Sequence, residues 1–281
     1  MAQIVGGLAT SHVPSIGIAI DRGDTQNDYW KPLFDGYLPA RRWLRDIRPD
    51  LAVVIYNDHG LEVFLDKVPT FGIGTAPLYP SGDEGWGPRP LPPVPGDPAS
   101  SWALVDSLVE DEFDVAMFQE LQVDHGFTVP MTLLWDWQPD WPVKTVPVLV
   151  NTIQYPFPTA RRCHRLGRAL RRAIDRLPDD LRVVVVGTGG MSHQLQGERA
   201  GFMNPAFDRM FLDKLGPAPE ELTRISRETY IREAGSEGAE LIMWLVMRGA
   251  MDAAVREVHR HYHISASLTA AGLVCYENAG G

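Results

Sequence analysis

The sequence has few cysteines, no long apolar run and no recurring basic tract, and each shortage excludes a class of protein. Its two cysteines, Cys163 and Cys275, form no CxxC or disulfide spacing, which favours a reducing compartment. The longest apolar stretch, 241–247, is far too short to span a bilayer, and the opening residues lack the basic and apolar regions of a signal peptide. The net charge of −10 argues against nucleic acid or an anionic membrane as the main partner. We therefore expect a soluble, cytoplasmic protein.

Strand-like apolar runs alternate with amphipathic helical segments throughout the 281 residues, which predicts an α/β fold. The runs 51–56 and 183–186 are continuous and rich in β-branched residues, as in strands buried on both faces of a parallel sheet. The arginine-rich stretch 159–177 predicts a helix with a solvated basic face. We expect one catalytic domain over 1–281, with a central, mostly parallel sheet flanked by helices. Its active site should lie at the C-terminal ends of the strands.

Residues 69–98 interrupt this rhythm with nine prolines and six glycines, a composition that predicts no regular helix or central strand. One interpretation is a solvated linker between domains. The other is an ordered lid or interface loop, because the segment also holds Phe71, Tyr79 and Trp86 and because long loops in compact domains are usually functional. We favour the ordered loop.

Histidines follow several of the strand-like runs. His12, His59 and His193 come in loops after 3–8, 51–56 and 183–186, and His125 follows a strand-like segment at 114–122. Because the carboxyl ends of parallel strands meet at one edge of a sheet, these imidazoles are expected to lie near one another as a metal or acid–base site. Three further histidines cluster at 259–263. On a helix, 259 and 263 would share a metal-binding face, but a fraying helix end with solvated imidazoles is favoured.

Glu240 directly precedes the apolar run 241–247, so a buried carboxylate there would need a partner. It is either a metal ligand or an acidic residue that stabilises a helix N-terminus. Two histidines and one carboxylate on one face of a metal suit non-haem Fe(II), which then keeps open positions for substrate and O₂. Zinc uses the same ligand types, so a metallohydrolase stays open as an alternative.

Several longer motifs resemble one family over almost the whole chain. They are SHVP at 11–14, DYW at 28–30, YNDH at 56–59, DEGWGPRP at 83–90, DHG at 124–126, GTGGMSHQLQG at 187–197 and the stretch 233–250. Together they resemble the β (catalytic) subunits of protocatechuate 4,5-dioxygenases, in the class III extradiol ring-cleavage family. The resemblance implies Fe(II) held by His12, His59 and Glu240. It also implies that His193 acts as the acid–base histidine and that His125 lies beside the iron and contacts substrate.

The same resemblance implies O₂-dependent cleavage of a catechol in aromatic-compound catabolism, with protocatechuate as the leading substrate. Two departures affect the substrate: Ile18 replaces a smaller residue, and Leu268, after Ser267, replaces an asparagine. All three positions are expected to bind substrate, so gallate, a methylated gallate or an uncarboxylated catechol are alternatives. A metal-binding module without oxygenase activity is a further one. The family's small α subunit implies an α₂β₂ assembly, or else a homo-oligomer.

Overall fold

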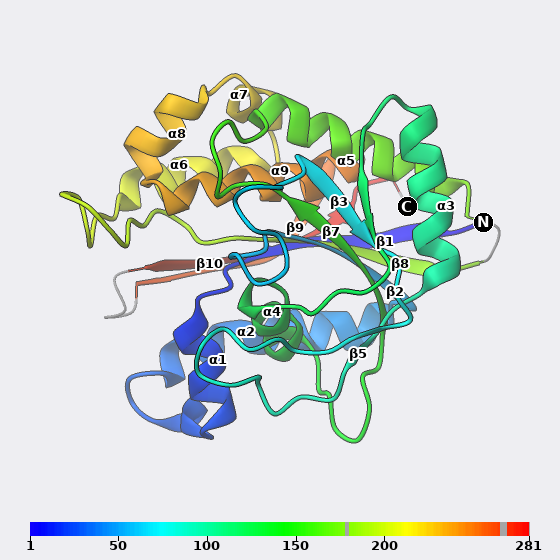
Figure 1. Ribbon diagram of the computed structural model, residues 1–281. Coiled ribbons are helices and arrows are strands. Elements are labelled where there is room, and N and C mark those ends of the chain that lie inside the picture. Colours follow the sequence, from blue (N-terminus) through cyan, green and yellow to red (C-terminus); the bar gives the residue numbers. More distant parts are fainter. Residues whose placement is uncertain (178–179, 265–268, 281) are drawn as a thin grey trace.

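An eight-stranded sheet forms the centre of the computed structural model, which describes residues 1–177, 180–264 and 269–280 (Figure 1). The strands lie in the order β6-β3-β7-β2-β8-β1-β10-β9. Their bounds are β1 Gln3–Thr10, β2 Leu51–Tyr56, β3 Phe71–Gly74, β6 Ala116–Phe118, β7 Lys144–Val150, β8 Arg182–Thr188, β9 Val255–Ile264 and β10 Ala270–Asn278. Two short strands, β4 (Leu78–Tyr79) and β5 (Val94–Pro95), pair with each other outside this sheet.

The central four strands, β7, β2, β8 and β1, run parallel, which confirms the predicted sheet. Every residue of β2 is buried, as its continuous apolar run predicts. Antiparallel pairing appears only toward the edges of the described sheet, where β10 joins β1, β9 joins β10, and β3 joins β7. The carboxyl ends of β1, β8 and β2 are therefore adjacent and point the same way.

Helices cover both faces of the sheet (Figure 1). One face carries α3 (Pro98–Glu110), α5 (Ala160–Asp175), α6 (Pro205–Leu215), α7 (Pro219–Thr223), α8 (Arg227–Ala234) and α9 (Leu241–Ala250), and the other carries α1 (Pro14–Asp21), α2 (Lys31–Ile47) and α4 (His125–Leu134). Two 3₁₀ turns, η1 (Asp24–Gln26) and η2 (Glu237–Glu240), complete the described elements. No helix among the described residues is both long and apolar enough to cross a membrane.

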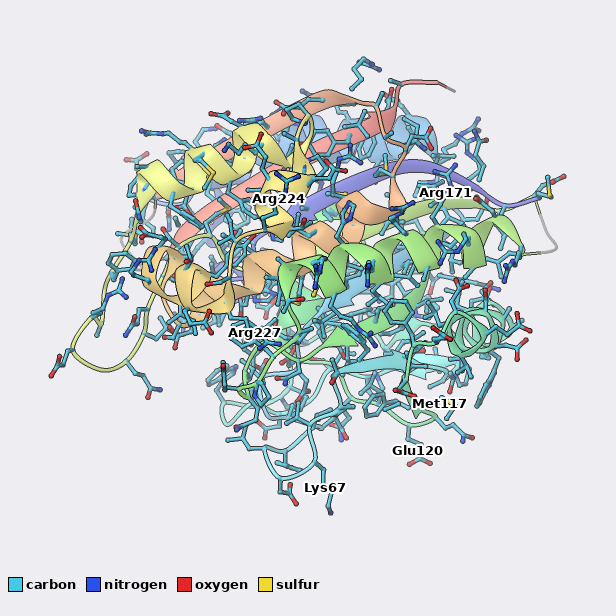
Figure 2. All side chains as sticks on the ribbon, turned by 90° about the horizontal axis from the view of Figure 1, so that it is seen from above. Lys67, Met117, Glu120, Arg171, Arg224 and Arg227 are labelled. Atoms are coloured by element: carbon cyan, nitrogen blue, oxygen red, sulfur yellow. The ribbon has the colours of Figure 1, made fainter. Side chains whose placement is uncertain are left out.

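The apolar run 241–247 becomes α9, which is buried at every position and packs beside α5 (Figure 2, in which Arg171 marks α5). Glycine permits this close approach. A Cβ on Gly167 of α5 would lie 2.0 Å from the carbonyl oxygen of Val246, and one on Gly249 of α9 would lie 2.2 Å from that of His164. The two helices thus pack backbone against backbone across the face of the sheet.

The prediction that 69–98 holds no central strand is wrong, because β3 joins the main sheet between β6 and β7. Its four residues contain no proline, and its glycines leave room for neighbouring rings. A Cβ on Gly72 would lie 2.4 Å from the Phe118 ring, and one on Gly74 would lie 2.9 Å from the Tyr79 hydroxyl. The rest of the segment is largely irregular, with Tyr79 fully buried, and its role as a lid or interface loop stays a prediction.

The predicted helix end at 259–263 is also wrong, because these residues lie in β9. His259, His261 and His263 occupy alternate positions of the strand and so share one face. They are half-buried rather than solvated, and His259 Nε2 lies 2.7 Å from the carbonyl oxygen of Gly36 in α2. The strand packs closely against α2: a Cβ on Gly36 would overlap the ring of His261. This packing favours the strand conformation over a helix end.

Candidate metal centre and active site

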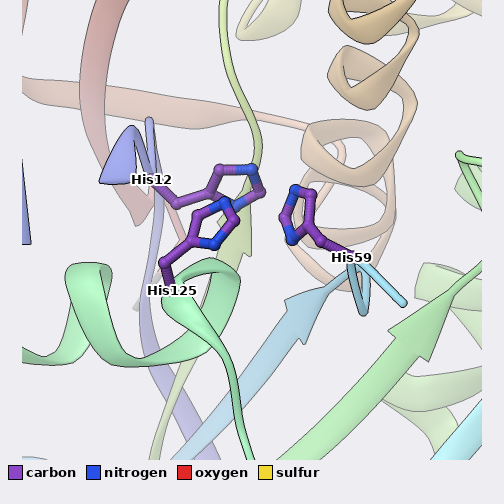
Figure 3. Close-up of side chains that lie close together, drawn as sticks. All are labelled: His12, His59 and His125. Carbon is purple, nitrogen blue, oxygen red and sulfur yellow. The ribbon is translucent and has the colours of Figure 1, made fainter. Parts of the chain in front are cut away.

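Three histidines from separate segments converge at the carboxyl ends of the parallel strands (Figure 3). His12 follows β1, His59 follows β2, and His125 is the first residue of α4. One ring nitrogen from each lies within 4.8 Å of the others. The ring centroids of His12 and His59 are 5.1 Å apart, and those of His59 and His125 are 3.9 Å apart. These three imidazoles therefore lie together at the carboxyl ends of the strands, as the sequence predicts.

Each of these rings is oriented through its Nδ1 atom. His12 Nδ1 lies 3.1 Å from the hydroxyl of Thr188, at the end of β8, and His59 Nδ1 lies 2.8 Å from a carboxylate oxygen of Asp124. His125 Nδ1 is paired with Glu84, which also accepts the backbone N–H of His125 at 2.9 Å. Nε2 is then the available ligand atom on all three rings, the arrangement by which proteins orient metal-binding histidines.

Glu240 supplies a carboxylate to the same cluster. Its oxygens lie 3.1 Å from His12 Nε2 and 3.4 Å from His59 Nε2. The backbone N–H of Gly190 donates to the carboxylate at 2.6 Å, and the side-chain amide of Asn57 donates at 3.2 Å. The chain reaches this position because Gly189 adopts φ +134°, where a Cβ would lie 2.9 Å from the Cβ of Glu240.

Charge at the cluster favours a cation. Burial alone would raise the pKa of Glu240, but His12 and His59 hold it well below its ordinary value, so the carboxylate is ionised. Burial alone would lower the pKa of His59, but Asp124 and Glu240 raise it to about 10. Burial, together with the charge of His59, lowers the pKa of His125. A bound divalent ion would displace the proton of His59, since metal-binding imidazoles must be neutral.

The donor set fits a metal of the transition series. Imidazole nitrogens and a carboxylate oxygen are ligands for iron and zinc alike. Next to them, the buried Oδ1 of Asn57 has no hydrogen-bond partner among the described residues, as expected for an atom facing a ligand or bound water. His12, His59 and His125 lie close enough together to hold one ion, and the Glu240 carboxylate adjoins the Nε2 atoms of His12 and His59.

His193 is buried beside this cluster, in the loop between β8 and α6. Its Nδ1 lies 2.8 Å from the carbonyl oxygen of Met191. A carbonyl can only accept, so Nδ1 carries the proton and Nε2 of the neutral ring is the basic atom. Its backbone is fixed as well, because the N–H of His193 donates to the carbonyl oxygen of Ala234. The carbonyl oxygen of His193 packs so closely against Gly235 (φ +90°) that a Cβ there would lie 2.0 Å from it.

Two cavities open at this end of the sheet. One, of about 160 Å³, is bounded by His125, Glu84, Trp86 and Ile18. The other, of about 310 Å³, is largely apolar and extends from His59 past Phe64 and Ile153. Ile18, predicted to contact substrate, thus borders a cavity that reaches His125.

Ser267 and Leu268 fall outside the described residues, so the structure does not place these two predicted substrate contacts. Conversely, sequence reasoning did not single out the orienting residues Asp124, Glu84 and Thr188. All three stand in the family-like motifs DHG, DEGWGPRP and GTGGMSHQLQG, which was the one available signal. Their roles depend on which histidine ring each of them contacts in the folded chain, and the sequence does not show this.

The whole-chain comparison defines the family. The family model for the catalytic LigB subunit of aromatic ring-opening dioxygenase matches residues 6–275. The chain therefore belongs to this family of extradiol ring-cleaving dioxygenases, which confirms the broader resemblance read from the sequence motifs.

Individual relatives differ in their substrates. Gallate dioxygenase of Pseudomonas putida KT2440 is 48% identical over 196 residues, which cover 70% of this chain and 57% of that protein. A 2,3-dihydroxyphenylpropionate/2,3-dihydroxicinnamic acid 1,2-dioxygenase of Rhodococcus is 29% identical over 290 residues, covering 88% of each. The corresponding enzyme of Cupriavidus necator is 36% identical over 189 residues, covering 67% of this chain and 58% of that one. The chain thus spans little more than half the length of some relatives.

A solved structure shares the fold. The crystal structure of an uncharacterized protein from Escherichia coli K12 superposes with a TM-score of 0.62, covering 96% of this chain and 99% of that one. At 16% identity this likeness supports the α/β architecture alone. The narrower resemblance to protocatechuate 4,5-dioxygenases stays a prediction, because the relatives described above act on other catechols.

Proposed function

We propose that the protein is an Fe(II)-dependent extradiol dioxygenase that cleaves the ring of a catechol-type substrate with O₂. The observation that carries this proposal is the convergence of His12, His59 and Glu240, with the imidazole rings oriented through Nδ1. Family membership supports the reaction class. Bound Fe(II) would supply open positions at which catechol and O₂ meet in one coordination sphere.

The chain's own residues would bind the substrate and move its proton. His193 Nε2, basic because Nδ1 donates to Met191, accepts a proton from a catechol hydroxyl and later returns it. An imidazole suits both directions because its neutral form accepts a proton and its protonated form donates one. His125, held in place by Glu84 at its Nδ1, would hydrogen-bond a substrate hydroxyl through its Nε2. The surrounding apolar cavity walls would exclude water.

Metal binding tests the ligand assignment. Protein reconstituted without oxygen should hold about one Fe(II) per chain, and alanine at His12, His59 or Glu240 should abolish that binding. Glutamine at His193 should leave the iron in place and lower turnover on the order of 10²–10⁴-fold, as for a lost general acid–base. Alanine at His164, a half-buried histidine of α5, is the control and should change neither. Iron retained by the Glu240 variant but lost by the His125 variant would replace this ligand set with three histidines.

Oxygen uptake with a panel of catechols tests the reaction. Stoichiometric O₂ consumption with a yellow ring-fission product supports the dioxygenase. Tightly bound zinc, hydrolytic activity and no uptake would favour the metallohydrolase. Metal binding with no uptake from any catechol, with or without a partner subunit, would favour a binding module.

For the substrate we propose a carboxylated catechol, and the panel decides between gallate and protocatechuate. The 48% identity to a gallate dioxygenase supports gallate, whereas the motif resemblance supports protocatechuate. Leu268 cannot make the hydrogen bonds of an asparagine. The Leu268→Asn variant should therefore gain kcat/KM for carboxylated substrates over plain catechol by about tenfold to a hundredfold, because a hydrogen bond to a charged group contributes roughly 1.5–3 kcal/mol. Equal values for both proteins would remove position 268 from carboxylate recognition.

We also propose that a second chain covers the active-site end. Phe64, Leu65, Trp86 and Tyr155 are large apolar side chains exposed at this end of the molecule. A small helical α subunit in an α₂β₂ assembly, or a second copy of this chain, would bury them. Sedimentation of the fully active protein as a monomer at assay concentration would contradict this.

A further inference from the structure

A buried carboxylate, Asp208 in the first turn of α6, lies behind the loop that carries His193. It is fully buried, and three donors point at its two oxygens. The backbone N–H of Ser192 donates to Oδ1 at 2.8 Å, the Ser192 hydroxyl donates to Oδ2 at 2.7 Å, and the Tyr262 hydroxyl donates to Oδ2 at 2.8 Å. Donors alone around both oxygens are the pattern of an ionised carboxylate.

Asp208 reaches His193 through a single peptide unit. The Ser192 N–H that Asp208 accepts and the Met191 carbonyl that accepts His193 Nδ1–H belong to the same planar amide. That plane cannot rotate without breaking both bonds. The carboxylate therefore fixes one side of the peptide, and the ring of His193 is fixed on the other.

The negative charge of Asp208 also acts on His193 through the Met191–Ser192 peptide. No lysine or arginine forms an ion pair with Asp208 among the described residues. A carboxylate bonded to an amide N–H polarises the amide and makes its carbonyl oxygen a stronger acceptor. Burial raises the pKa of Asp208 above its ordinary value, and the bonds from Ser192 and Tyr262 and the charge of His193 offset only part of that rise. Carboxylate and imidazole are thus electrostatically coupled across the Met191–Ser192 peptide.

We propose that Asp208 is a positioning residue for His193, acting through the Met191–Ser192 peptide to hold the Nδ1–H tautomer that leaves Nε2 as the proton acceptor. Tyr262, on the edge strand β9, holds Asp208 in turn. The Ser192 hydroxyl closes the network by accepting the backbone N–H of Asn204 at 2.7 Å, at the N-cap of α6. The catalytic part of this inference rests on the proposed function.

A double-mutant cycle tests the coupling. Asp208→Asn keeps the shape but removes the charge, and should lower kcat for ring cleavage about ten- to a hundredfold, a part of the 10²–10⁴-fold effect of a general acid–base. KM for the catechol and the iron content should stay unchanged. In a His193→Gln background the same change should lower kcat less than twofold, because the residue it positions is gone. Asp213→Asn is the matched control: it lies five residues later on α6, exposed and paired with Arg260.

A second measurement is independent of turnover. Nitrogen-15 NMR of histidine-labelled protein should show the His193 ring, assigned with the His193→Gln variant, protonated at Nδ1 in the parent and in a mixture of tautomers in Asp208→Ala. Tyr262→Phe removes one donor to Asp208 and should shift activity in the same direction by a smaller factor, so an unfolded Asp208 variant does not end the test.

Two outcomes would overturn the positioning role. One is an Asp208→Asn loss of equal factor in both backgrounds, and the other is an unchanged His193 tautomer in Asp208→Ala. If the parent consumes no oxygen, the proposed function fails, and the tautomer measurement still decides whether Asp208 holds the ring.

Discussion

Replacing Asp124 by asparagine should destabilise the metal-free protein by about 2 kcal/mol. Asp124 is fully buried and has two tasks. One oxygen accepts both the backbone N–H of His59 at 2.7 Å and its Nδ1 at 2.8 Å. The other accepts the N–H of Gly126 at 2.9 Å and so caps the N-terminus of α4. The same residue thus holds a candidate metal ligand and begins a helix.

The magnitude follows from what an asparagine can still do. Its single amide oxygen can face either His59 or Gly126. Facing His59 leaves the NH₂ group against the Gly126 N–H, which loses the helix cap, worth about 1 kcal/mol. The bond to His59 also becomes uncharged, and charge-assisted bonds contribute about 1 kcal/mol more than neutral ones. The two losses give the expected 2 kcal/mol.

The difference between parent and variant should depend on pH in a specific way. His59 lowers the pKa of Asp124 from 3.8 to about 2 despite burial, so this contribution to stability is present above pH 3.8 and is lost as the pH falls toward 2. The pKa of His59 is raised from 6.5 to about 10, so its contribution is present below pH 6.5 and is lost as the pH rises toward 10. The difference should be largest between about pH 4 and 6.5.

Urea unfolding of chelator-treated protein, followed by circular dichroism at pH 3, 5.5 and 9.5, measures this difference. Asp83→Asn is the control, because Asp83 is exposed and accepts only backbone N–H groups of its own turn, which an asparagine can still bind. It should change stability by less than about 0.5 kcal/mol. An Asp124→Asn effect that is equally small at pH 5.5, or one that does not shrink at pH 3 and 9.5, would refute the reasoning.

Three further predictions concern packing and specificity. Gly167→Ala places a Cβ about 2.0 Å from a carbonyl oxygen of α9 and should cost about 1–3 kcal/mol of unfolding free energy by overpacking, measured by urea denaturation. Arg248 is buried, and two nitrogens of its guanidinium donate to the carbonyl oxygens of Gly216 and Ala253. A lysine ammonium cannot reach both in this planar geometry, so Arg248→Lys should lower the free energy of unfolding by at least about 1.5 kcal/mol, again measured by urea denaturation. Ile18→Ala should enlarge the cavity beside His125 and raise kcat/KM for gallate relative to protocatechuate; an unchanged ratio would exclude Ile18 from substrate choice.

Much of the sheet could be predicted because its central strands are buried on both faces. The runs 51–56 and 183–186 show this directly as unbroken apolar sequence. The strands β3 and β9 could not be predicted from the sequence, for different reasons. In β3, glycines replace the expected β-branched residues because aromatic rings from other segments fill the space. In β9, histidines occupy the half-buried face because α2 covers it, and no local pattern reveals that cover.

The sequence could predict the candidate ligands and the nearby histidines of the site, but not the residues that orient them. His12 and His59 follow strand-like runs, so the rule that such loops meet at one edge could bring them together. For Glu240 the residues alone left two interpretations, a metal ligand or a helix N-terminus, and the family resemblance favoured the first. Asp208 has no signal in the sequence at all, because an acidic residue at the start of a helix is ordinary and its burial depends on the loop packed against it.

The wide separation of the cluster along the chain has a consequence for how the protein is made. Glu240 meets His12 across 228 positions of sequence, from the loop after β1 to the 3₁₀ turn η2 before α9. During synthesis from the N-terminus, the two histidines emerge early but the carboxylate emerges late. A nascent chain therefore cannot bring the three proposed ligands together until residue 240 has left the ribosome. Under the proposed Fe(II) assignment, loading of the ion would wait until the sheet and η2 have come together.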